Sequence, residues 1–157
     1  MKTKKLLSII VLILIIAFAF VSYETALSKF RLSDKNYTYL ADLTWHRQFD
    51  KGLQIAQEEN KPVAIYFWAV WCQYCAAFQT NTLGNAQINK MLKEDYVLMA
   101  MDLDVDKDVA QKFGVSYPPV VVFLDANGKE VDRTIGAVDA GTFLPIATKV
   151  RDQVRRK

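Results

Sequence analysis

Residues that could hold a metal ion are scarce in this sequence. Among its 157 residues are two cysteines, Cys72 and Cys75, and one histidine, His46. A structural zinc site takes about four protein ligands and a catalytic one about three. No acidic residue stands at a spacing from the cysteines that would suggest a shared metal site. The alternating acids at 102, 104, 106 and 108 lack the glycine and distal glutamate of an EF-hand loop. We therefore expect no metal and no dissociable cofactor, and we interpret these acids as strand-end and helix-cap residues.

Most of the chain has no excess of positive or negative charge. The formal net charge is +3, and Lys2, Lys4 and Lys5 account for all of it. Binding to phosphates requires a basic face, so we expect no nucleic-acid partner. Hydrophobic residues make up 52% of the chain, which is too many for a disordered protein and enough for a buried core.

A long apolar run does occur, near the N-terminus. Residues 6–21 are apolar except for Ser8, and three lysines precede them. This run is slightly longer than the apolar region of a cleaved signal peptide, which has about 7–15 residues. It is slightly shorter than a spanning helix, which needs about 17–25 residues. We predict a signal peptide or a signal anchor helix over residues 1–23, with its lysines on the cytoplasmic side. Either would place the remaining chain outside the cytoplasm, in a periplasm-like compartment that tolerates disulfides, secreted or anchored in the membrane through residues 6–21.

The rest of the chain alternates between strand and helix patterns. We expect a polar tether over residues 24–41 that ends in a strand near 37–40, and one domain over residues 42–157. Apolar runs and helical spacing predict strands at 62–70, 96–104, 119–124 and 129–136, with helices at 72–92, broken near 84–85, and at 107–115. This order implies an α/β fold, a mixed sheet with helices on both faces.

Two further helices are expected at the ends of the domain. Trp45, Phe49 and Leu53 recur at helical spacing, which predicts a first helix that carries an exposed His46. Asp139 is a candidate N-cap for the last helix. Pro145 would disrupt the interior of a helix that begins at residue 140, so we expect the regular part to begin later.

The cysteine pair reads Cys72-Gln73-Tyr74-Cys75 and follows a predicted strand. A permanent bridge over such a short separation would constrain little of the unfolded chain, whereas C-x-x-C beside a strand–helix–strand pattern is typical of a redox dithiol. Cys72 lies where strand changes to helix, so free N–H groups of the first turn would stabilise its thiolate. We predict that Cys72 attacks and that the more deeply buried Cys75 resolves the mixed disulfide.

Several further segments match those of a known family. FWAVWCQYC, DLDVD, FGVSYPPVVVF, DANGKEV and Gly136 together resemble the thioredoxin family, over residues 42–157. The lead-in and the N-terminal run are most similar to its extracytoplasmic branch, as in the C-terminal thioredoxin domain of DsbD-type thiol:disulfide interchange proteins. The resemblance implies a thioredoxin fold and a cis-proline at Pro119 that faces the cysteines. It also implies catalytic cysteines and a substrate face, or tuning residues, at Trp71, Gln73, Tyr74, Pro118 and Pro119.

The sequence departs from the family pattern in three ways: in two neutral residues near Cys75, in the dipeptide between the cysteines, which is Gln73-Tyr74 where the family has Gly-Pro, and in Pro118. Tyr66 stands where thioredoxins have a buried acid, and Gln79 is neutral where DsbD-type domains tend to have an acid. Proton transfer from Cys75 would then need water or another group. Pro118, before the expected cis-proline, has no N–H to pair with a bound substrate.

We expect a monomeric thiol–disulfide oxidoreductase that reduces disulfides of exported proteins. Its partners would be these exported thiol/disulfide proteins and a membrane reductase that supplies the electrons. A disulfide oxidase or isomerase would use the same cysteines, so only the reduction potential and the recycling partner separate these functions. The alternative of another class is a non-catalytic module that binds client proteins on a thioredoxin scaffold.

Overall fold

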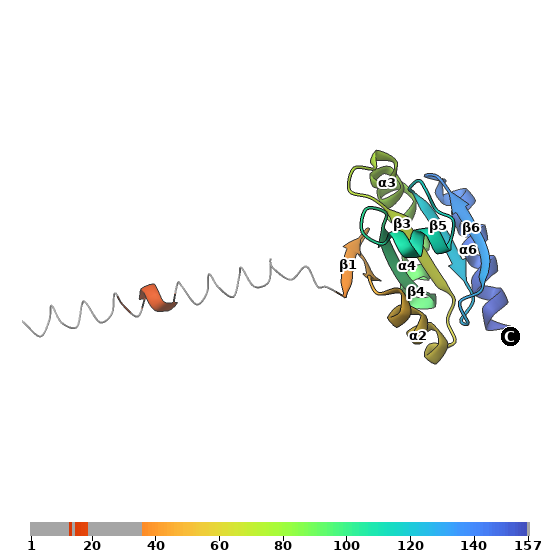
Figure 1. The fold of residues 1–157 in the computed structure, drawn as a ribbon, viewed down its shortest axis with the longest axis horizontal. Coiled ribbons are helices and arrows are strands. Elements are labelled where there is room, and N and C mark those ends of the chain that lie inside the picture. Colours follow the sequence, from red (N-terminus) through yellow and green to blue (C-terminus); the bar gives the residue numbers. More distant parts are fainter. Residues whose placement is uncertain (1–12, 14, 19–35, 157) are drawn as a thin grey trace, which may run out of the picture. The chain divides into compact units, whose positions relative to one another are not determined.

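A six-stranded mixed sheet forms the centre of the folded domain (Figure 1). The computed structural model describes residues 13, 15–18 and 36–156. The strands lie in the order β1-β2-β4-β3-β5-β6. β3 runs parallel to β4 and antiparallel to β5. Their bounds are β1 (Tyr37–Leu40), β2 (Leu43–His46), β3 (Val63–Trp68), β4 (Val97–Asp102), β5 (Val120–Leu124) and β6 (Glu130–Ile135).

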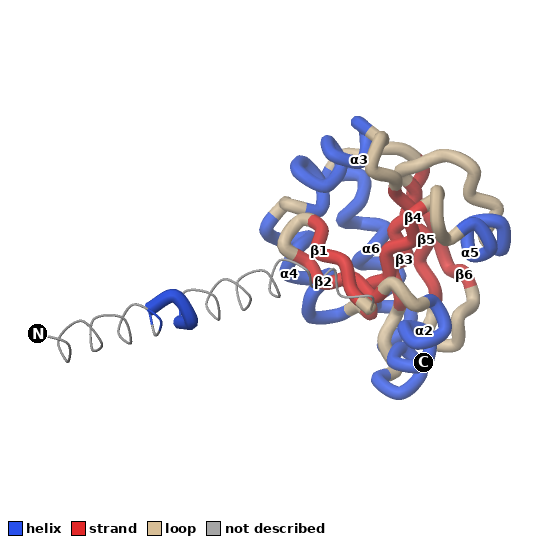
Figure 2. Tube along the Cα trace, turned by 60° about the vertical axis from the view of Figure 1, so that its left-hand side comes forward, coloured by secondary structure: helices blue, strands red, loops and turns tan. Residues whose placement is uncertain are grey.

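Helices cover both faces of the sheet, and Figure 2 shows α5 on one side of the strands and α4 on the other. Side chains of β3 alternate between two buried clusters, with Tyr66 in one and Phe67 in the other. The first cluster includes residues of α3, α4 and α6, and the second includes residues of α2 and α5. The helices are α2 (Phe49–Glu59), α3 (Gln73–Phe78), the π-helix η1 (Gln79–Leu83), α4 (Ala86–Asp95), α5 (Lys107–Lys112) and α6 (Ala140–Arg155).

Most of the predicted elements are present. The strand expected at 37–40 is β1, and the helical stretch from 72 to 92 is interrupted at Gly84-Asn85, where Asn85 caps α4. Asp139 caps α6, and its carboxylate accepts a hydrogen bond from the Thr142 N–H at 2.7 Å.

The N-terminal signal peptide or anchor and most of the tether lie outside the described residues, so they stay predictions. Within the parts of the chain that the structure describes, no helix has both the length and the apolar character needed to cross a membrane.

The prediction that the first helix includes Trp45 and His46 is wrong. Both residues lie in β2, and the helix α2 begins at Phe49. Trp45 satisfies a helical spacing with Phe49 and also a strand alternation with Leu43. Pairing with β1 favours the strand over the helix, because the strand buries Leu43 and Trp45 on one face. His46 is half-buried, and its ring centroid lies 4.9 Å from that of Tyr37.

The expectation that the regular part of α6 begins later than residue 140 is also wrong, because the helix runs without a break from Ala140 to Arg155. A proline at this position removes the N–H that would donate to the carbonyl of Gly141, four residues earlier. Gly141 and Pro145 are both exposed, so water can satisfy that carbonyl. The cap at Asp139 and the buried side chains of Phe143, Ala147 and Val150 hold the helix in place.

We predict that Pro145→Ala stabilises the domain. Alanine restores the missing hydrogen-bond donor, and its helix propensity exceeds that of proline by about 3 kcal/mol, less about 1 kcal/mol for the greater entropy of the unfolded chain. Urea unfolding should therefore show a free energy of unfolding about 1–2 kcal/mol higher than that of the wild type. An equal or lower value would mean that the carbonyl of Gly141 loses nothing by facing water.

Candidate active site

Four segments meet at one end of the sheet because of how the strands pair. The last residue of β3, Trp68, lies opposite the last residue of β4, Asp102. The first residue of β5, Val120, lies opposite Ile135, the last residue of β6, and β5 is antiparallel to β3. The segments that leave these strand ends, at 69–72, 103–106, 116–119 and 136–139, therefore lie at the same end.

The two cysteines lie at this end and are joined as a disulfide, with their Cα atoms 5.2 Å apart. Cys72 is the N-cap residue of α3, and its Sγ accepts a hydrogen bond from the Cys75 N–H at 3.0 Å. Cys75 is 1% exposed and Cys72 is 7% exposed. The geometry places Cys72 nearer to solvent, with a backbone donor that would stabilise its thiolate once the bond is reduced.

A neutral pair of side chains lies next to Cys75. The hydroxyl of Tyr66 donates to the carbonyl oxygen of Cys75 at 3.5 Å and accepts a hydrogen bond from Gln79 Nε2 at 3.2 Å. Burial raises the pKa of Tyr66 to about 12, and the hydrogen bond from Gln79 lowers it by a smaller amount. The phenol therefore stays protonated at neutral pH, and neither side chain can act as a base toward the Cys75 thiol.

A hydrogen bond connects the segment before the cysteines to the loop after β4. The indole Nε1 of Trp71 donates to Asp104 Oδ2 at 2.9 Å, and the Asp104 N–H donates to Asp102 Oδ1 at 2.9 Å. The Asp102 N–H in turn donates to Asp106 Oδ2 at 2.7 Å, and Asp106 is the N-cap residue of α5. Asp102 thus ends β4 and Asp106 stands at the N-cap position of α5, as predicted, but the Asp106 carboxylate bonds to the Asp102 N–H and makes no side-chain cap to the helix. Asp104 holds the exposed Trp71.

The peptide bond between Pro118 and Pro119 is cis, as expected for Pro119. Pro119 is buried, and its carbonyl accepts a hydrogen bond from the Gly136 N–H at 2.8 Å. Gly136 has φ +84°, a conformation that residues other than glycine rarely adopt. Pro118 is half-buried.

The remaining predicted site residues, Gln73 and Tyr74, are exposed on the first turn of α3. The structure also brings Tyr117 and Ile135 to this end of the sheet, which sequence reasoning missed; both are exposed. Tyr117 directly precedes Pro118 and Pro119, and this position next to the expected cis-proline could have identified it as a site residue. Nothing in the sequence alone marks Ile135, because its place follows from the pairing of β6 with β5.

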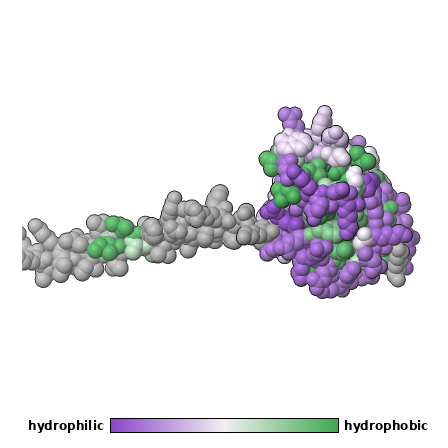
Figure 3. All heavy atoms as spheres, viewed as in Figure 1, coloured by the Kyte–Doolittle hydropathy of each residue, from purple (hydrophilic) through white to green (hydrophobic). Residues whose placement is uncertain are grey.

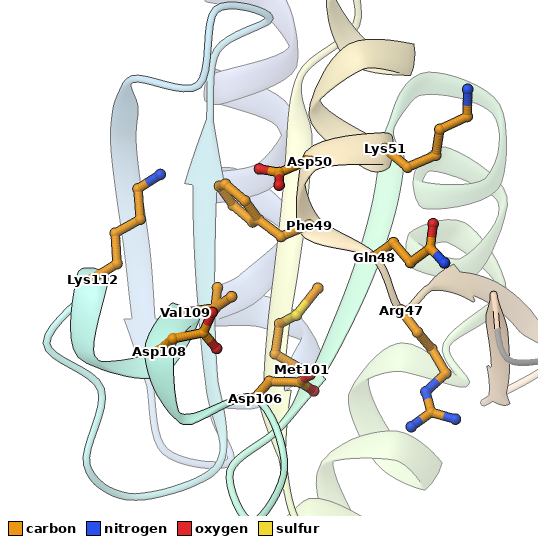
Figure 4. Close-up of a pocket in the computed structure, with 10 residues that line it drawn as sticks. All are labelled: Arg47, Gln48, Phe49, Asp50, Lys51, Met101, Asp106, Asp108, Val109 and Lys112. Atoms are coloured by element: carbon orange, nitrogen blue, oxygen red, sulfur yellow. The ribbon is translucent and has the colours of Figure 1, made fainter.

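A separate hollow of about 490 Å³ lies between α2 and α5 and contains neither cysteine (Figure 4). Acidic and basic side chains from both helices surround Phe49 and Met101 there. The ammonium group of Lys112 lies 4.5 Å from the centroid of the Phe49 ring. The pKa of Asp106 is raised, mainly because burial disfavours its charged form. Its charges of both signs and its lack of cysteine set it apart from the disulfide site.

Comparisons with known proteins agree with this geometry. A family model described as a thioredoxin-like domain matches residues 49–151. Among curated proteins, the thiol:disulfide interchange protein DsbD of Pseudomonas sp. (strain JR1 / K1) is 31% identical over 108 residues, which is 65% of this chain and 18% of that protein. Anterior gradient protein 3 of Mus musculus is 29% identical over 85 residues, 54% of this chain and 50% of that protein. The chain thus matches less than a fifth of that DsbD relative's length.

Solved structures show the same fold. A thioredoxin from Thermus thermophilus superimposes with a TM-score of 0.61 at 26% identity, covering 66% of this chain and 84% of the other. The oxidised C-terminal domain of DsbD from Neisseria meningitidis has a TM-score of 0.55 at 20% identity, covering 64% and 90% of the two chains; this shows the fold alone. Since the family model spans about two thirds of the sequence, the chain belongs to the thioredoxin-like family.

Proposed function

We propose that this protein is a thiol–disulfide oxidoreductase whose reacting groups are Cys72 and Cys75. The observation that carries the proposal is the disulfide at the start of α3, where the Cys75 N–H donates to Cys72 Sγ. A thiolate at Cys72 would keep this donor, and Cys72 is the more exposed of the two sulfurs. The similarity to DsbD, a protein named as a thiol:disulfide interchange protein, supports the same chemistry.

The reaction proceeds by two exchanges. In the reduced protein, the Cys72 thiolate attacks one sulfur of a substrate disulfide, a mixed disulfide forms and the other substrate sulfur leaves as a thiolate. The Cys75 thiol loses its proton and attacks Cys72 Sγ, which releases the second substrate thiol. The substrate gains two electrons and two protons, and the protein ends in the Cys72–Cys75 disulfide.

We further propose that the direction is reductive and that the substrates are exported thiol or disulfide proteins outside the cytoplasm. A dithiol of a membrane reductase would return the disulfide to the reduced form. The N-terminal apolar run with its preceding lysines and the similarity to DsbD relatives support this location.

The alternative functions remain distinguishable. An oxidase or isomerase would use the same cysteines at a higher reduction potential. The neutral pair Tyr66 and Gln79, which provides no base for Cys75, favours the third possibility, a module that binds client proteins without exchanging disulfides.

The first prediction of this proposal concerns the two sulfurs separately. Reduced wild-type protein should reduce the disulfides of insulin, and Cys72→Ser should abolish this reaction because the attacking sulfur is gone. Cys75→Ser should instead accumulate as a mixed disulfide, since nothing resolves it, and mass spectrometry of the quenched reaction measures it. Tyr39→Ala, an exposed change on β1, is the control and should react as the wild type does. A Cys72→Ser/Cys75→Ser variant that complements a knockout of the gene would favour the client-binding module, because this variant can exchange no disulfide.

The second prediction concerns the proton of Cys75. Gln79→Glu places a carboxylate where the amide now contacts the Tyr66 hydroxyl, beside the Cys75 backbone. A positioned base typically accelerates proton transfer by about 10²–10⁴-fold, so Cys75 should resolve the mixed disulfide with the substrate, and release that substrate, at least roughly tenfold faster at pH 7. The rate should then depend less steeply on pH between 7 and 9, because proton removal no longer relies on hydroxide.

The matched control is Gln87→Glu, which makes the same chemical change at an exposed position on α4, away from the cysteines. It should leave the release rate close to that of the wild type. If both variants accelerate release equally, the effect comes from net charge, and Gln79 has no special position relative to Cys75.

A further inference from the structure

The helix that carries Cys75 continues without a break into the π-helix η1. The N–H of Gly84 donates to the Gln79 carbonyl at 2.8 Å, which closes the wide turn of η1. A Cβ at Gly84 would lie 2.6 Å from the Thr80 carbonyl oxygen, so only glycine fits there without a shift of the backbone. The sequence thus fixes this turn, and single π turns within helices often lie at functional sites.

One side chain of η1 forms a hydrogen bond with a segment that is distant in sequence. Thr82 is 1% exposed, and its Oγ1 donates to the carbonyl oxygen of Val138 at 2.6 Å. Thr80, the other threonine of η1, is exposed and donates to the Ala76 carbonyl of its own helix at 3.0 Å. Of the two hydroxyls, only that of Thr82 therefore connects the cysteine-bearing helix to the segment that follows β6.

The segment that accepts this hydrogen bond also holds the cis-proline turn. The Val138 N–H donates to the Gly136 carbonyl at 2.9 Å, and the Gly136 N–H donates to the Pro119 carbonyl at 2.8 Å. Among residues 36–156, no other hydrogen bond joins α3 or η1 to the proline turn or to residues 136–139. The Thr82 hydroxyl therefore provides the hydrogen-bonded connection between the cysteine side and the proline side of the site.

Apolar packing and this hydrogen bond have different effects on the helix. The ring centroids of Phe78 and Phe143 lie 5.7 Å apart, and this contact holds α3 against α6. Hydrophobic contact has no preferred direction, so it tolerates small shifts of α3 along α6. A hydrogen bond weakens steeply when its angle departs from the optimum. The bond from Thr82 therefore sets the position of the helix relative to residues 136–138.

The position of the helix matters more for a large substrate than for a small one. Cys72 is only 7% exposed, so a polypeptide disulfide that reaches its sulfur also meets the segments around it. Figure 3 shows these surroundings as pale and green surface at the end of the domain where α3 lies in Figure 1. A small disulfide can reach the sulfur with few such contacts. Since misplacement by about 1 Å can slow a reaction roughly 100-fold, a shift of the helix should affect polypeptide substrates most.

We propose that Thr82 is a positioning residue for disulfide exchange with polypeptides. Its hydroxyl holds the cysteine-bearing helix at a set distance from residues 136–138 and, through Gly136, from the proline turn. A polypeptide disulfide then meets Cys72 in a geometry suited to attack. This inference rests on the proposed function and adds to it a residue outside the C-x-x-C motif.

The test compares Thr82→Val with the wild type, both as reduced full-length protein in single turnover. Valine keeps the shape of threonine but leaves the carbonyl of Val138, a half-buried residue, without its donor. An unpaired carbonyl is costly, so the segment shifts toward water. The rate with insulin should fall at least about tenfold, whereas the rate with 2-hydroxyethyl disulfide should stay that of the wild type. The NMR signal of the Gly136 amide should also shift, because this N–H bonds to Pro119 from the displaced segment.

Thr80→Val is the matched control, because it removes a hydroxyl from the same π-helix that bonds only within its own helix. It should react with insulin as the wild type does. Thr82→Ser keeps the donor and should recover most of the insulin rate and the wild-type position of the Gly136 signal. Urea unfolding measures whether each variant is folded under the assay conditions. Should Thr82→Val fail to fold, Thr82→Ala, which also lacks the hydroxyl, gives the same comparison.

The two disulfides separate this inference from the proposed function. An unchanged insulin rate in the folded variant without the hydroxyl, an equal fall with both disulfides, or an equal effect of Thr80→Val would overturn the inference. A Thr82→Ser variant as slow with insulin as Thr82→Val would overturn it as well. Failure of the wild type to react with 2-hydroxyethyl disulfide would overturn the proposed function instead.

Discussion

The position of β3 between a parallel and an antiparallel neighbour is the constraint on which the rest of the site depends. Its parallel pairing with β4 brings the loop of Asp104 beside the cysteine segment, and its antiparallel pairing with β5 brings the Pro118-Pro119 turn to the same end. Five of the six residues of β3 are buried. A shift in the register of either pairing would therefore expose apolar side chains. The disulfide, the indole of Trp71 and the Pro118-Pro119 turn thus occupy one end of the sheet.

The chemistry of this end is governed by neutral groups. Tyr66 and Gln79 contact each other beside Cys75, and the charge-free stretch 62–89 places no cationic side chain of its own next to Cys72. The backbone N–H of Cys75 donates to Cys72 Sγ in the disulfide, and a Cys72 thiolate would keep this donor. A dithiol becomes a strong oxidant when its reduced form is stabilised. A single backbone donor gives modest stabilisation, which is consistent with the reductive direction that we propose.

Much of this arrangement could be predicted from the sequence because its signals are local. The C-x-x-C at a strand–helix junction, the Asp139 cap and the buried run of β3 each depend on residues close in sequence. The errors arose where packing overrides a local pattern: Trp45 fits two periodicities, and α6 tolerates Pro145 because its opposite face is buried. Ile135 became part of the site only through its pairing with Val120, a long-range register that no local pattern encodes.

The equilibrium reduction potential of the Cys72–Cys75 pair tests the central claim most directly. The protein would be titrated in thiol buffers of defined potential, and tryptophan fluorescence would report the fraction reduced. Our account predicts a value near that of thioredoxin, about −270 mV, as expected for a reductant in a neutral environment. A value near about −120 mV would make the protein a donor of disulfides and would contradict the account, and a pair that never cycles would contradict it as well.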